Sequence, residues 1–315
     1  MVKATALWCI GSNASDLRDG ELGQGVLVET LFSGISRGTE KLVFEGRVPQ
    51  GEWTRMRTFA QEGDFSFPVK FGYCAVGKVL EGELSGRQVF ALHPHQSQFR
   101  MPEGMLNLLP ADLPAERAIL AANMETALNI LWDSGASAGD RIAVIGVGVV
   151  GALVGYLAAK LPGTKVTLVD LNPARADLAK KLGCEFATPA EAPSECDVVI
   201  HTSASEAGVA LALEIAGQEA IIVEASWFGS GLVGVPLGES FHSRRLRIVS
   251  SQVGNLPSHK VPRWNHKRRM SMALDLLRDS RLDALISGET VFEKIAESYA
   301  SILNNPDTLC HRIRY

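Results

Sequence analysis

The 315-residue chain lacks the features that mark secreted, membrane-spanning or nucleic-acid-binding proteins. No apolar run reaches the length of a transmembrane helix, and the N-terminus lacks the charged region and apolar core of a signal peptide. The formal net charge is −4, which gives the chain no basic footprint for nucleic acid or an acidic membrane. We therefore expect a cytoplasmic protein with no membrane and no nucleic-acid partner.

Cysteine is also scarce, and internal repeats and low-complexity segments are missing. The five cysteines are scattered and odd in number, which favours a reducing compartment over a disulfide framework. With 46% hydrophobic residues, a chain of this length can bury a large core and is expected to form two domains.

A glycine motif between a strand and a helix is the strongest functional signal. Residues 142–145 are an apolar run typical of a buried parallel strand, and residues 153–160 indicate a helix. Between them, Gly146, Gly148 and Gly151 have the spacing G-x-G-x-x-G. The first allows a tight turn, the second a close approach to a pyrophosphate, and the third close packing of helix on strand. This context predicts a dinucleotide site rather than a glycine-rich turn of another α/β protein.

The residues around the motif refine this prediction. Val149 and Val150, between the second and third glycines, are further cofactor candidates, and the free N–H groups and dipole of the helix that follows favour phosphate. A second strand, residues 165–169, ends at Asp170, a carboxylate that would accept bonds from ribose hydroxyls and repel a 2′-phosphate. NAD(H) is therefore preferred, with NADP(H) possible. Leu171 and Arg175 follow as further cofactor candidates; Arg175 could hold a 2′-phosphate or be a solvated helix residue.

The rest of the chain separates into a β-rich part and an α/β part. Strands are expected at residues 3–10, 25–32, 71–80 and 88–93, and residues 45–68 form a long loop that could cover a cleft. Beyond Asp170, strands alternate with helices, which predicts a doubly wound parallel sheet. Strands are expected at residues 197–201, 220–225 and 246–250, helices at 172–182, 205–216, 268–277 and 292–303, and a last strand at 308–315 that returns to the β-rich domain.

Several segments together resemble the medium-chain dehydrogenase/reductase superfamily, whose best-known members are the zinc alcohol dehydrogenases. They are SGISRGTE (residues 33–40), FGYCAVGKV (71–79), GRQVFA (86–91), METAL (124–128) and the glycine motif. The resemblance implies a GroES-like β-barrel-type domain from residues 1–122 and 255–315, and a Rossmann domain from residues 123–254. Residues 33–49 also look like those of dehydrogenases that act on the hydroxyethyl side chain of bacteriochlorophyllide.

The three positions that hold catalytic zinc in the zinc enzymes are all changed. Ser36, Tyr73 and Ala122 stand where the resemblance places Cys, His and Cys, and the four-cysteine cluster of the structural zinc is missing. A catalytic zinc needs about three N, S or carboxylate ligands, which Ser, Tyr and Ala cannot provide. We therefore expect a zinc-free member. A metal at His93 and His95 is the alternative, although no third ligand has a readable spacing.

Without zinc, another group must handle charge on the substrate oxygen. The resemblance places the Tyr73 phenol near the nicotinamide, where it could donate a proton or be a packed tyrosine. His93 and His95 are the runner-up acid/base candidates, and Glu40 is a further candidate whose expected ion-pair partner is Arg37. The resemblance also directs Arg37 toward the pyrophosphate.

Further cofactor candidates follow strands or lie in the METAL segment. Thr202 and Ser203 should lie along the adenosine or the bridging region, and Ala225, Ser226 and Trp227 near the nicotinamide. Trp227 could instead pack in the core or at a subunit interface. Gln252 could reach the carboxamide side, and Thr126 is the candidate in the METAL segment.

Two basic stretches, residues 241–247 and 260–269, favour a solvated face or an acidic substrate over nucleic acid. The resemblance implies a homodimer or homotetramer, with an edge strand near residues 229–237 as a contact. The sequence thus predicts an NAD(P)(H)-dependent oxidoreductase acting on a carbonyl/alcohol pair of a small molecule. The alternatives are a quinone or enoyl (alkene) reductase and a non-catalytic nucleotide-binding sensor.

Overall fold

The computed structural model describes residues 4–315 and divides the chain into two compact units. Unit 1 consists of residues up to 122 together with residues 270–315, and unit 2 of residues 123–269. The sequence placed the second boundary at residue 255, whereas residues 255–269 are part of unit 2. The physical reason is buried Arg269, whose guanidinium donates to Glu125, to Asn129 and to the backbone oxygen of Val253.

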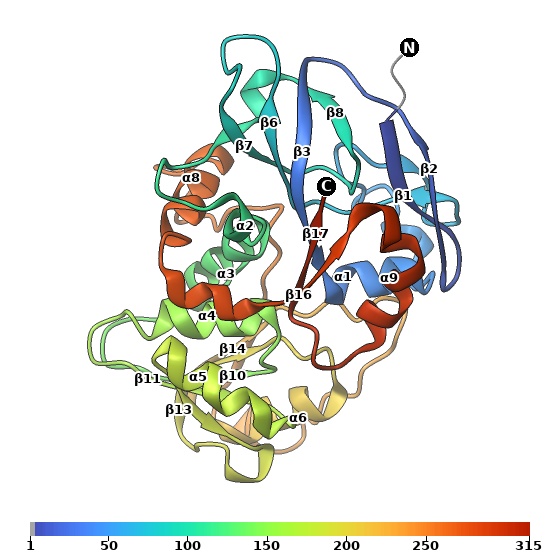
Figure 1. Cartoon of the computed structure of the whole chain (residues 1–315). Helices are drawn as coiled ribbons and strands as arrows, with labels where there is room; N and C mark the ends of the chain where they lie inside the picture. Colours follow the sequence, from blue (N-terminus) through green and yellow to red (C-terminus); the bar gives the residue numbers. More distant parts are fainter. Residues whose placement is uncertain (1–3) are drawn as a thin grey trace. The chain divides into compact units, whose positions relative to one another are not determined.

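Unit 2 is built on a six-stranded parallel sheet in the order β12-β11-β10-β13-β14-β15. Figure 1 labels its strands β10, β11, β13 and β14. The central strands form because their residues are nearly continuous apolar runs, which suit a sheet covered on both faces. The predicted doubly wound sheet is confirmed. Its strands are β10 (Arg141–Ile145), β11 (Lys165–Val169), β12 (Glu185–Ala187), β13 (Cys196–His201), β14 (Ala216–Glu224) and β15 (Arg247–Ser250).

Helices pack on this sheet and place its loops. Helix α4 packs on β10 and β11, and α6 packs on β13 and β14, with a core of Ala143, Val199, Leu213 and Ile222 among others. The strand order reverses between β10 and β13, which is where parallel sheets of this kind bind ligands. The helices are α3 (Ala121–Ser134), α4 (Val149–Ala158), η3 (Pro173–Arg175), α5 (Ala176–Leu182), η4 (Pro189–Glu191), α6 (Glu206–Ile215) and α7 (Ser240–Ser243).

Unit 1 is β-rich, with a seven-stranded sheet and a four-stranded sheet. The larger sheet has the order β16-β17-β3-β6-β7-β9, with β8 also paired to β3, and the smaller has the order β2-β1-β5-β4. The strands are β1 (Ala4–Gly11), β2 (Ala14–Gly20), β3 (Val26–Ser36), β4 (Glu62–Gly63), β5 (Val69–Lys70), β6 (Ala75–Val79), β7 (Gln88–Ala91), β8 (Gln98–Met101), β9 (Asn107–Leu108), β16 (Ile286–Val291) and β17 (Cys310–Arg314).

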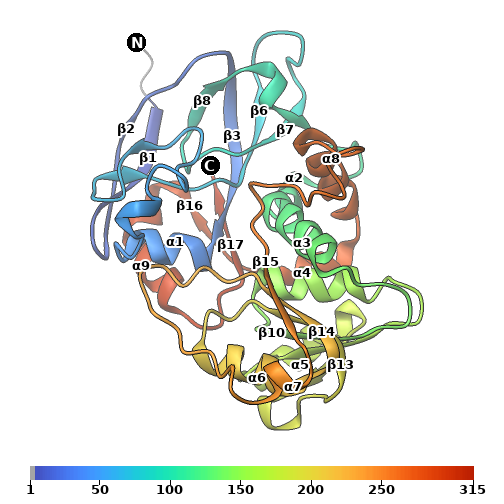
Figure 2. The ribbon, with the colours of Figure 1, turned by 180° about the vertical axis from the view of Figure 1, so that it is seen from behind.

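Apolar side chains of β3, β6, β7 and β8 form a core of this unit, including Val28, Val79, Val89 and Phe99. The last strand, β17, lies between β16 and β3 (Figure 2), which confirms that the chain end returns to the β-rich part. The helices are α1 (Arg37–Phe44), η1 (Gln50–Glu52), η2 (Glu103–Met105), α2 (Ala115–Ala118), η5 (Ser280–Leu285), η6 (Phe292–Lys294), α9 (Ile295–Asn304) and α8 (His266–Leu276), which contains the boundary.

Two details differ from the sequence-based expectation. Strand β2 was missed because its sequence is polar and half-exposed, so it has no apolar alternation. The edge strand expected near residues 229–237 is wrong: those residues form no strand, and the edge strands of the sheet are β12 and β15. Within residues 4–315, no helix combines the length and the apolar character needed to cross a membrane.

Candidate functional site

The glycine motif forms a tight loop between β10 and α4 in unit 2. Gly146 has a φ of +99°, and a Cβ there would lie 2.8 Å from the backbone nitrogen of Ser203. A Cβ on Gly151 would lie 2.0 Å from the carbonyl oxygen of Gly146, so no side chain fits. Gly148 differs, because a Cβ there would meet nothing within 4 Å. Packing of the protein itself therefore explains Gly146 and Gly151, whereas the space in front of Gly148 is free for a ligand.

The start of α4 suits an anion. Gly148 is the N-cap residue and offers no side chain to the first N–H groups of the ten-residue helix, which begins at Val149 and Val150. Those N–H groups and the positive end of the helix dipole are the usual partners of a bound phosphate. The open space and these donors together fit the pyrophosphate of a dinucleotide.

Asp170 is fixed beside this loop. One carboxylate oxygen accepts a hydrogen bond of 2.7 Å from the N–H of Val147, and the other accepts one of 2.8 Å from the N–H of Asn172. Asn172 in turn caps η3, which contains Arg175, while Leu171 is 85% exposed. The carboxylate is thus held at the tip of β11, as the sequence predicts for a ribose ligand.

The end of β13 is joined directly to the glycine loop. The Thr202 hydroxyl donates a hydrogen bond of 2.8 Å to the carbonyl of Gly146, and the Thr202 N–H donates one of 2.8 Å to the carbonyl of Ile145. Ser203 packs against Gly146. The structure therefore brings these two predicted residues to the dinucleotide loop at the point where the strand order reverses.

A buried histidine that the sequence reasoning missed lies behind Ser203. The imidazole of His201 is wholly buried, with Nδ1 2.7 Å from a carboxylate oxygen of Glu224 and Nε2 2.7 Å from the Ser203 hydroxyl. The Ser226 N–H donates to the other oxygen of Glu224 at 2.8 Å. Both His201 and Glu224 end apolar strand runs, DVVIH and AIIVE, and that shared position is the signal that could have revealed them.

The remaining cofactor candidates of unit 2 have varied surroundings. The Ala225 N–H donates to the carbonyl of His201, which places the residues from Ala225 to half-buried Trp227 directly after β14. The side-chain oxygen of Gln252 accepts from the N–H of Gly254, so this amide is turned back on its own loop. Thr126 is half-buried on α3. Their contacts with a cofactor stay predictions.

In unit 1, Glu40 is a fully buried carboxylate on α1. One oxygen accepts a hydrogen bond of 2.7 Å from the N–H of Ser36, and the other accepts from His95 Nε2 at 2.9 Å and from the Tyr299 hydroxyl at 2.7 Å. The expected ion pair with Arg37 is wrong, since the Arg37 guanidinium donates to the backbone oxygen of Leu303 instead. Burial of a carboxylate costs free energy unless the group is hydrogen-bonded, and these three donors offset that cost for Glu40.

Tyr73 lies at the turn between β5 and β6, and its phenol is hydrogen-bonded by the side chains of Ser36 and Thr39. The structure thereby brings together the residues that replace two zinc ligands. Burial, followed by the nearby Cys74 and Glu40, raises the pKa of the Tyr73 phenol well above its usual value. Tyr73 therefore keeps its proton at neutral pH and can act as a hydrogen-bond or proton donor.

The two histidines of the H-P-H step have separate surroundings. His93 stacks on Phe99 with ring centroids 4.0 Å apart, and its Nδ1 lies 2.9 Å from the carbonyl of Pro94. Burial, together with the charge of Lys70, lowers the pKa of His93 to about 3, so this ring stays neutral. His95 instead joins Glu40 to Ser33, whose hydroxyl lies 2.8 Å from its Nδ1. His95 is thus the better placed of the two for proton transfer.

Within residues 4–315, no group of three or more His, Cys, Asp or Glu side chains has the geometry to hold a metal ion. At the positions that the resemblance assigns to zinc, a hydroxyl, a phenol and a methyl group are present in Ser36, Tyr73 and Ala122. This donor set does not fit zinc.

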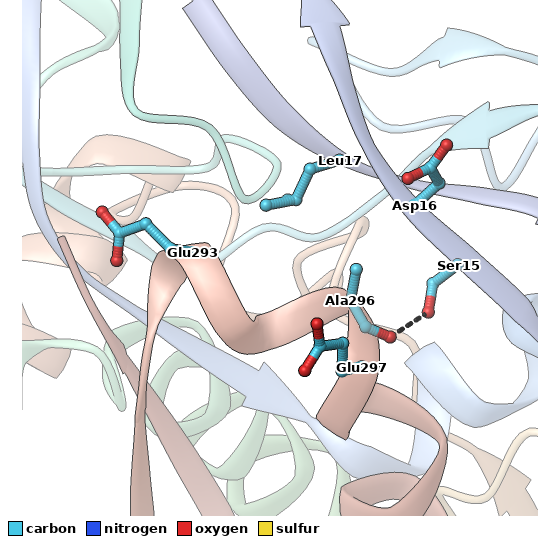
Figure 3. A pocket seen from close by; sticks show the side chains of 6 residues that line it. All are labelled: Ser15, Asp16, Leu17, Glu293, Ala296 and Glu297. Atoms are coloured by element: carbon cyan, nitrogen blue, oxygen red, sulfur yellow. Dashed lines mark hydrogen bonds between the residues drawn. The ribbon is translucent and has the colours of Figure 1, made fainter.

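A cavity of about 290 Å³ lies elsewhere in unit 1, between β2 and the start of α9. Figure 3 shows its lining side chains, of which Asp16, Glu293 and Glu297 are carboxylates. The Ser15 hydroxyl donates to the backbone oxygen of Ala296 and so closes one side of it. None of the predicted catalytic residues lines this cavity, and it plays no part in the proposal for catalysis.

Known proteins that are similar to this chain are dehydrogenases, which fits the dinucleotide site that the glycine loop before α4 indicates. No family model matches the chain. D-guloside 3-dehydrogenase from Escherichia coli K12 is 22% identical over 88% of this chain and 89% of its own length. An alcohol dehydrogenase from E. coli CFT073 solved with NADH has a TM-score of 0.78 at 15% identity, covering 99% of both chains. A proposed zinc-binding dehydrogenase from Sinorhizobium meliloti solved with NADP has a TM-score of 0.77 at 17% identity, covering both chains fully.

These likenesses span the whole chain, and they confirm the GroES-like and Rossmann fold. Its relatives and structural neighbours are zinc-type alcohol dehydrogenase-like medium-chain dehydrogenases/reductases, the group that its motifs resemble. A nicotinamide cofactor is supported, and because one neighbour holds NADH and the other NADP, the fold alone does not choose between them.

Proposed function

We propose that this dehydrogenase moves a hydride between NAD(H) and a carbonyl/alcohol pair of a small molecule without catalytic zinc, with NADP(H) as the weaker cofactor. The observation that carries the proposal is the protonated phenol of Tyr73, held by Ser36 and Thr39 where relatives would hold a metal. The relative that acts on a guloside supports a sugar or polyol hydroxyl as the substrate group. A cytoplasmic homodimer or homotetramer completes the proposal.

Reduction of a carbonyl requires a hydride at carbon and a proton at oxygen. Nicotinamide, when bound, supplies the hydride. Tyr73 donates its proton to the developing alkoxide, and the Ser36 and Thr39 side chains stabilise the phenolate that results. Oxidation by the reverse route starts from the Tyr73 phenolate, which takes up the hydroxyl proton, so the raised pKa of Tyr73 favours reduction at neutral pH. Asp170 supports the preference for NAD(H), since its carboxylate is fixed where a 2′-phosphate would meet it.

Turnover of chelator-treated enzyme with NADH tests the proposal on a panel of polyols, secondary alcohols and their carbonyl forms, a quinone, and a porphyrin bearing a hydroxyethyl group. We expect turnover on one carbonyl/alcohol pair and a roughly 100-fold lower kcat in Tyr73→Phe, the usual effect of losing a general acid. Tyr156→Phe removes the same hydroxyl from buried helix α4 and is the matched control.

Full activity of Tyr73→Phe, or activity that requires one equivalent of added zinc, would contradict the proposed chemistry. Turnover of only the quinone would favour the alkene and quinone reductases. Tight NADH binding without turnover of any substrate would favour a nucleotide sensor.

A further inference from the structure

His201 and Glu224 are paired by the register of the parallel sheet. They are direct neighbours at the last rungs of β13 and β14, so the pairing of the two strands sets the imidazole beside the carboxylate. His201 is wholly buried, yet its Nε2 is only 2.7 Å from the hydroxyl of Ser203, a residue exposed at the same sheet edge. A buried titratable ring is thus connected to the surface through one hydroxyl.

Helix α6 is shaped around this cluster. A Cβ on Gly208 would lie 2.4 Å from His201 Nε2 and 2.6 Å from the Ser203 hydroxyl oxygen, so any side chain there would displace the pair. The N-cap residue Ser205 accepts from the Gly208 N–H at 3.1 Å, and its hydroxyl lies 2.8 Å from that of Ser203. The absence of a side chain on one turn of the helix therefore makes room for a hydrogen-bonded chain of imidazole and two hydroxyls.

The cluster lies against the dinucleotide loop. Ser203 lies against Gly146, and the Thr202 hydroxyl donates to the Gly146 carbonyl. The Ser203 hydroxyl, which is hydrogen-bonded to His201, is therefore at the end of the sheet where phosphates bind in folds of this kind. The charged side chain bonded to His201 is the carboxylate of Glu224 on β14, and the Asp170 carboxylate accepts from the N–H of Val147 in the glycine loop. With a neutral imidazole, the negative charge of Glu224 is not offset by His201 near the loop where a pyrophosphate is proposed to bind.

We propose that His201 is a positioning residue that couples cofactor binding to a proton: the dinucleotide binds more tightly when His201 is protonated. This inference rests on the proposed dinucleotide binding. A carboxylate only accepts, so neutral His201 carries its hydrogen on Nδ1 toward Glu224 and accepts the Ser203 hydrogen at Nε2.

Protonation reverses the role of Ser203. Nε2 then donates to the Ser203 oxygen, and the Ser203 hydrogen turns to Ser205 or outward to an acceptor such as a phosphate or ribose oxygen. The imidazolium also offsets the charge of Glu224. Both effects favour an anionic ligand. Binding therefore takes up a proton, and the Kd for NADH rises with pH by at most about tenfold per pH unit.

Isothermal titration calorimetry with NADH tests this coupling in two buffers of different ionisation enthalpy, between pH 6 and 8. We expect proton uptake by the wild-type chain that is lost in His201→Gln. The matched control is His242→Gln, which removes an exposed histidine from α7 near the opposite edge of the sheet and leaves the uptake unchanged. If His201→Gln does not fold, Glu224→Gln replaces it and weakens the uptake at pH 7, because the imidazole loses its anionic partner.

Wild-type binding without proton exchange overturns the inference, as does uptake in His201→Gln that equals that of the wild-type chain. Where His201→Gln does not fold, undiminished uptake in Glu224→Gln overturns it. Failure of the wild-type chain to bind NADH or NADPH at any pH is a different result, which overturns the proposed function itself.

Discussion

Glu40 is a single side chain whose removal would disturb three donors at once. The N–H of Ser36, the ring of His95 and the Tyr299 hydroxyl all bond to its carboxylate in a fully buried setting. We expect Glu40→Ala to lower the free energy of unfolding by about 3 kcal/mol, because the donors are left unsatisfied. Urea denaturation measures this. Exposed Glu297→Ala is the control and should change stability by no more than about 0.5 kcal/mol; a similar loss in both variants would contradict the prediction.

Asp170 is also a single residue, and the expected preference for NADH over NADPH depends on it. Its carboxylate is held by the N–H groups of Val147 and Asn172, so it cannot turn away from a 2′-phosphate without losing those bonds. We expect wild-type protein to bind NADH at least about tenfold more tightly than NADPH, and Asp170→Asn to narrow that ratio. Fluorescence titration gives both Kd values. Asp177→Asn, an exposed residue in α5, should leave the ratio as it is, and tighter wild-type binding of NADPH would refute the assignment.

At the scale of the element, two glycines of the loop before α4 have different purposes: Gly151 is required by the packing of the protein, and Gly148 by the proposed binding of the pyrophosphate. In Gly151→Ala the new Cβ would lie 2.0 Å from the Gly146 carbonyl oxygen, so we expect a lower melting temperature. Gly148→Ala meets nothing within 4 Å and has a φ of −75°, so the fold should be unchanged while the methyl group enters the space for the pyrophosphate. We expect its Kd for NADH to rise by about tenfold, about 1.4 kcal/mol.

Each glycine variant is the control for the other, because Gly151→Ala is expected to lower the melting temperature and Gly148→Ala to weaken the binding of NADH. Gly148→Ala with unchanged NADH affinity would show that phosphates do not bind in front of this helix. Gly151→Ala with unchanged melting temperature would show that the loop can shift away from the helix.

At the scale of the whole molecule, the buried thiols make stability depend on alkaline pH. Burial raises the pKa of Cys9, Cys184 and Cys310 to about 12 and that of Cys196 to about 11, against an ordinary value near 9. Because the folded state holds these protons more tightly, their contribution is complete below pH 9 and is lost as the pH rises toward 11 or 12.

We therefore expect the free energy of unfolding to fall above pH 9, by at most about 1.4 kcal/mol per pH unit for each thiol. Urea denaturation at pH 8 and pH 10 measures the slope. Cys184→Ala removes one of these thiols and should therefore reduce the slope by at most about 1.4 kcal/mol per pH unit. The same slope in the variant, or a stability that rises with pH, would contradict the prediction.

A feature of this structure could be predicted from the sequence when its residues are close together along the chain. The glycine loop and Asp170 were predictable because strand, turn, helix and carboxylate follow each other within about thirty residues. The partners of Glu40 were not, because His95 is 55 positions away and Tyr299 is 259 positions away. The pairing of His201 with Glu224 also depends on which strands are neighbours, and the shared position of the two residues at the ends of apolar runs does not specify that by itself.

The place of β17 in its sheet also sets an order of assembly. Strand β17 is central, paired on one side with β3 from the beginning of the chain and on the other with β16. During synthesis, every strand of unit 2 is made before β17, so the nucleotide-binding half can fold while the other half still lacks an inner strand. Until β17 pairs with it, β3 presents an open backbone edge, and this is the interval in which a chaperone or a second nascent chain would meet it.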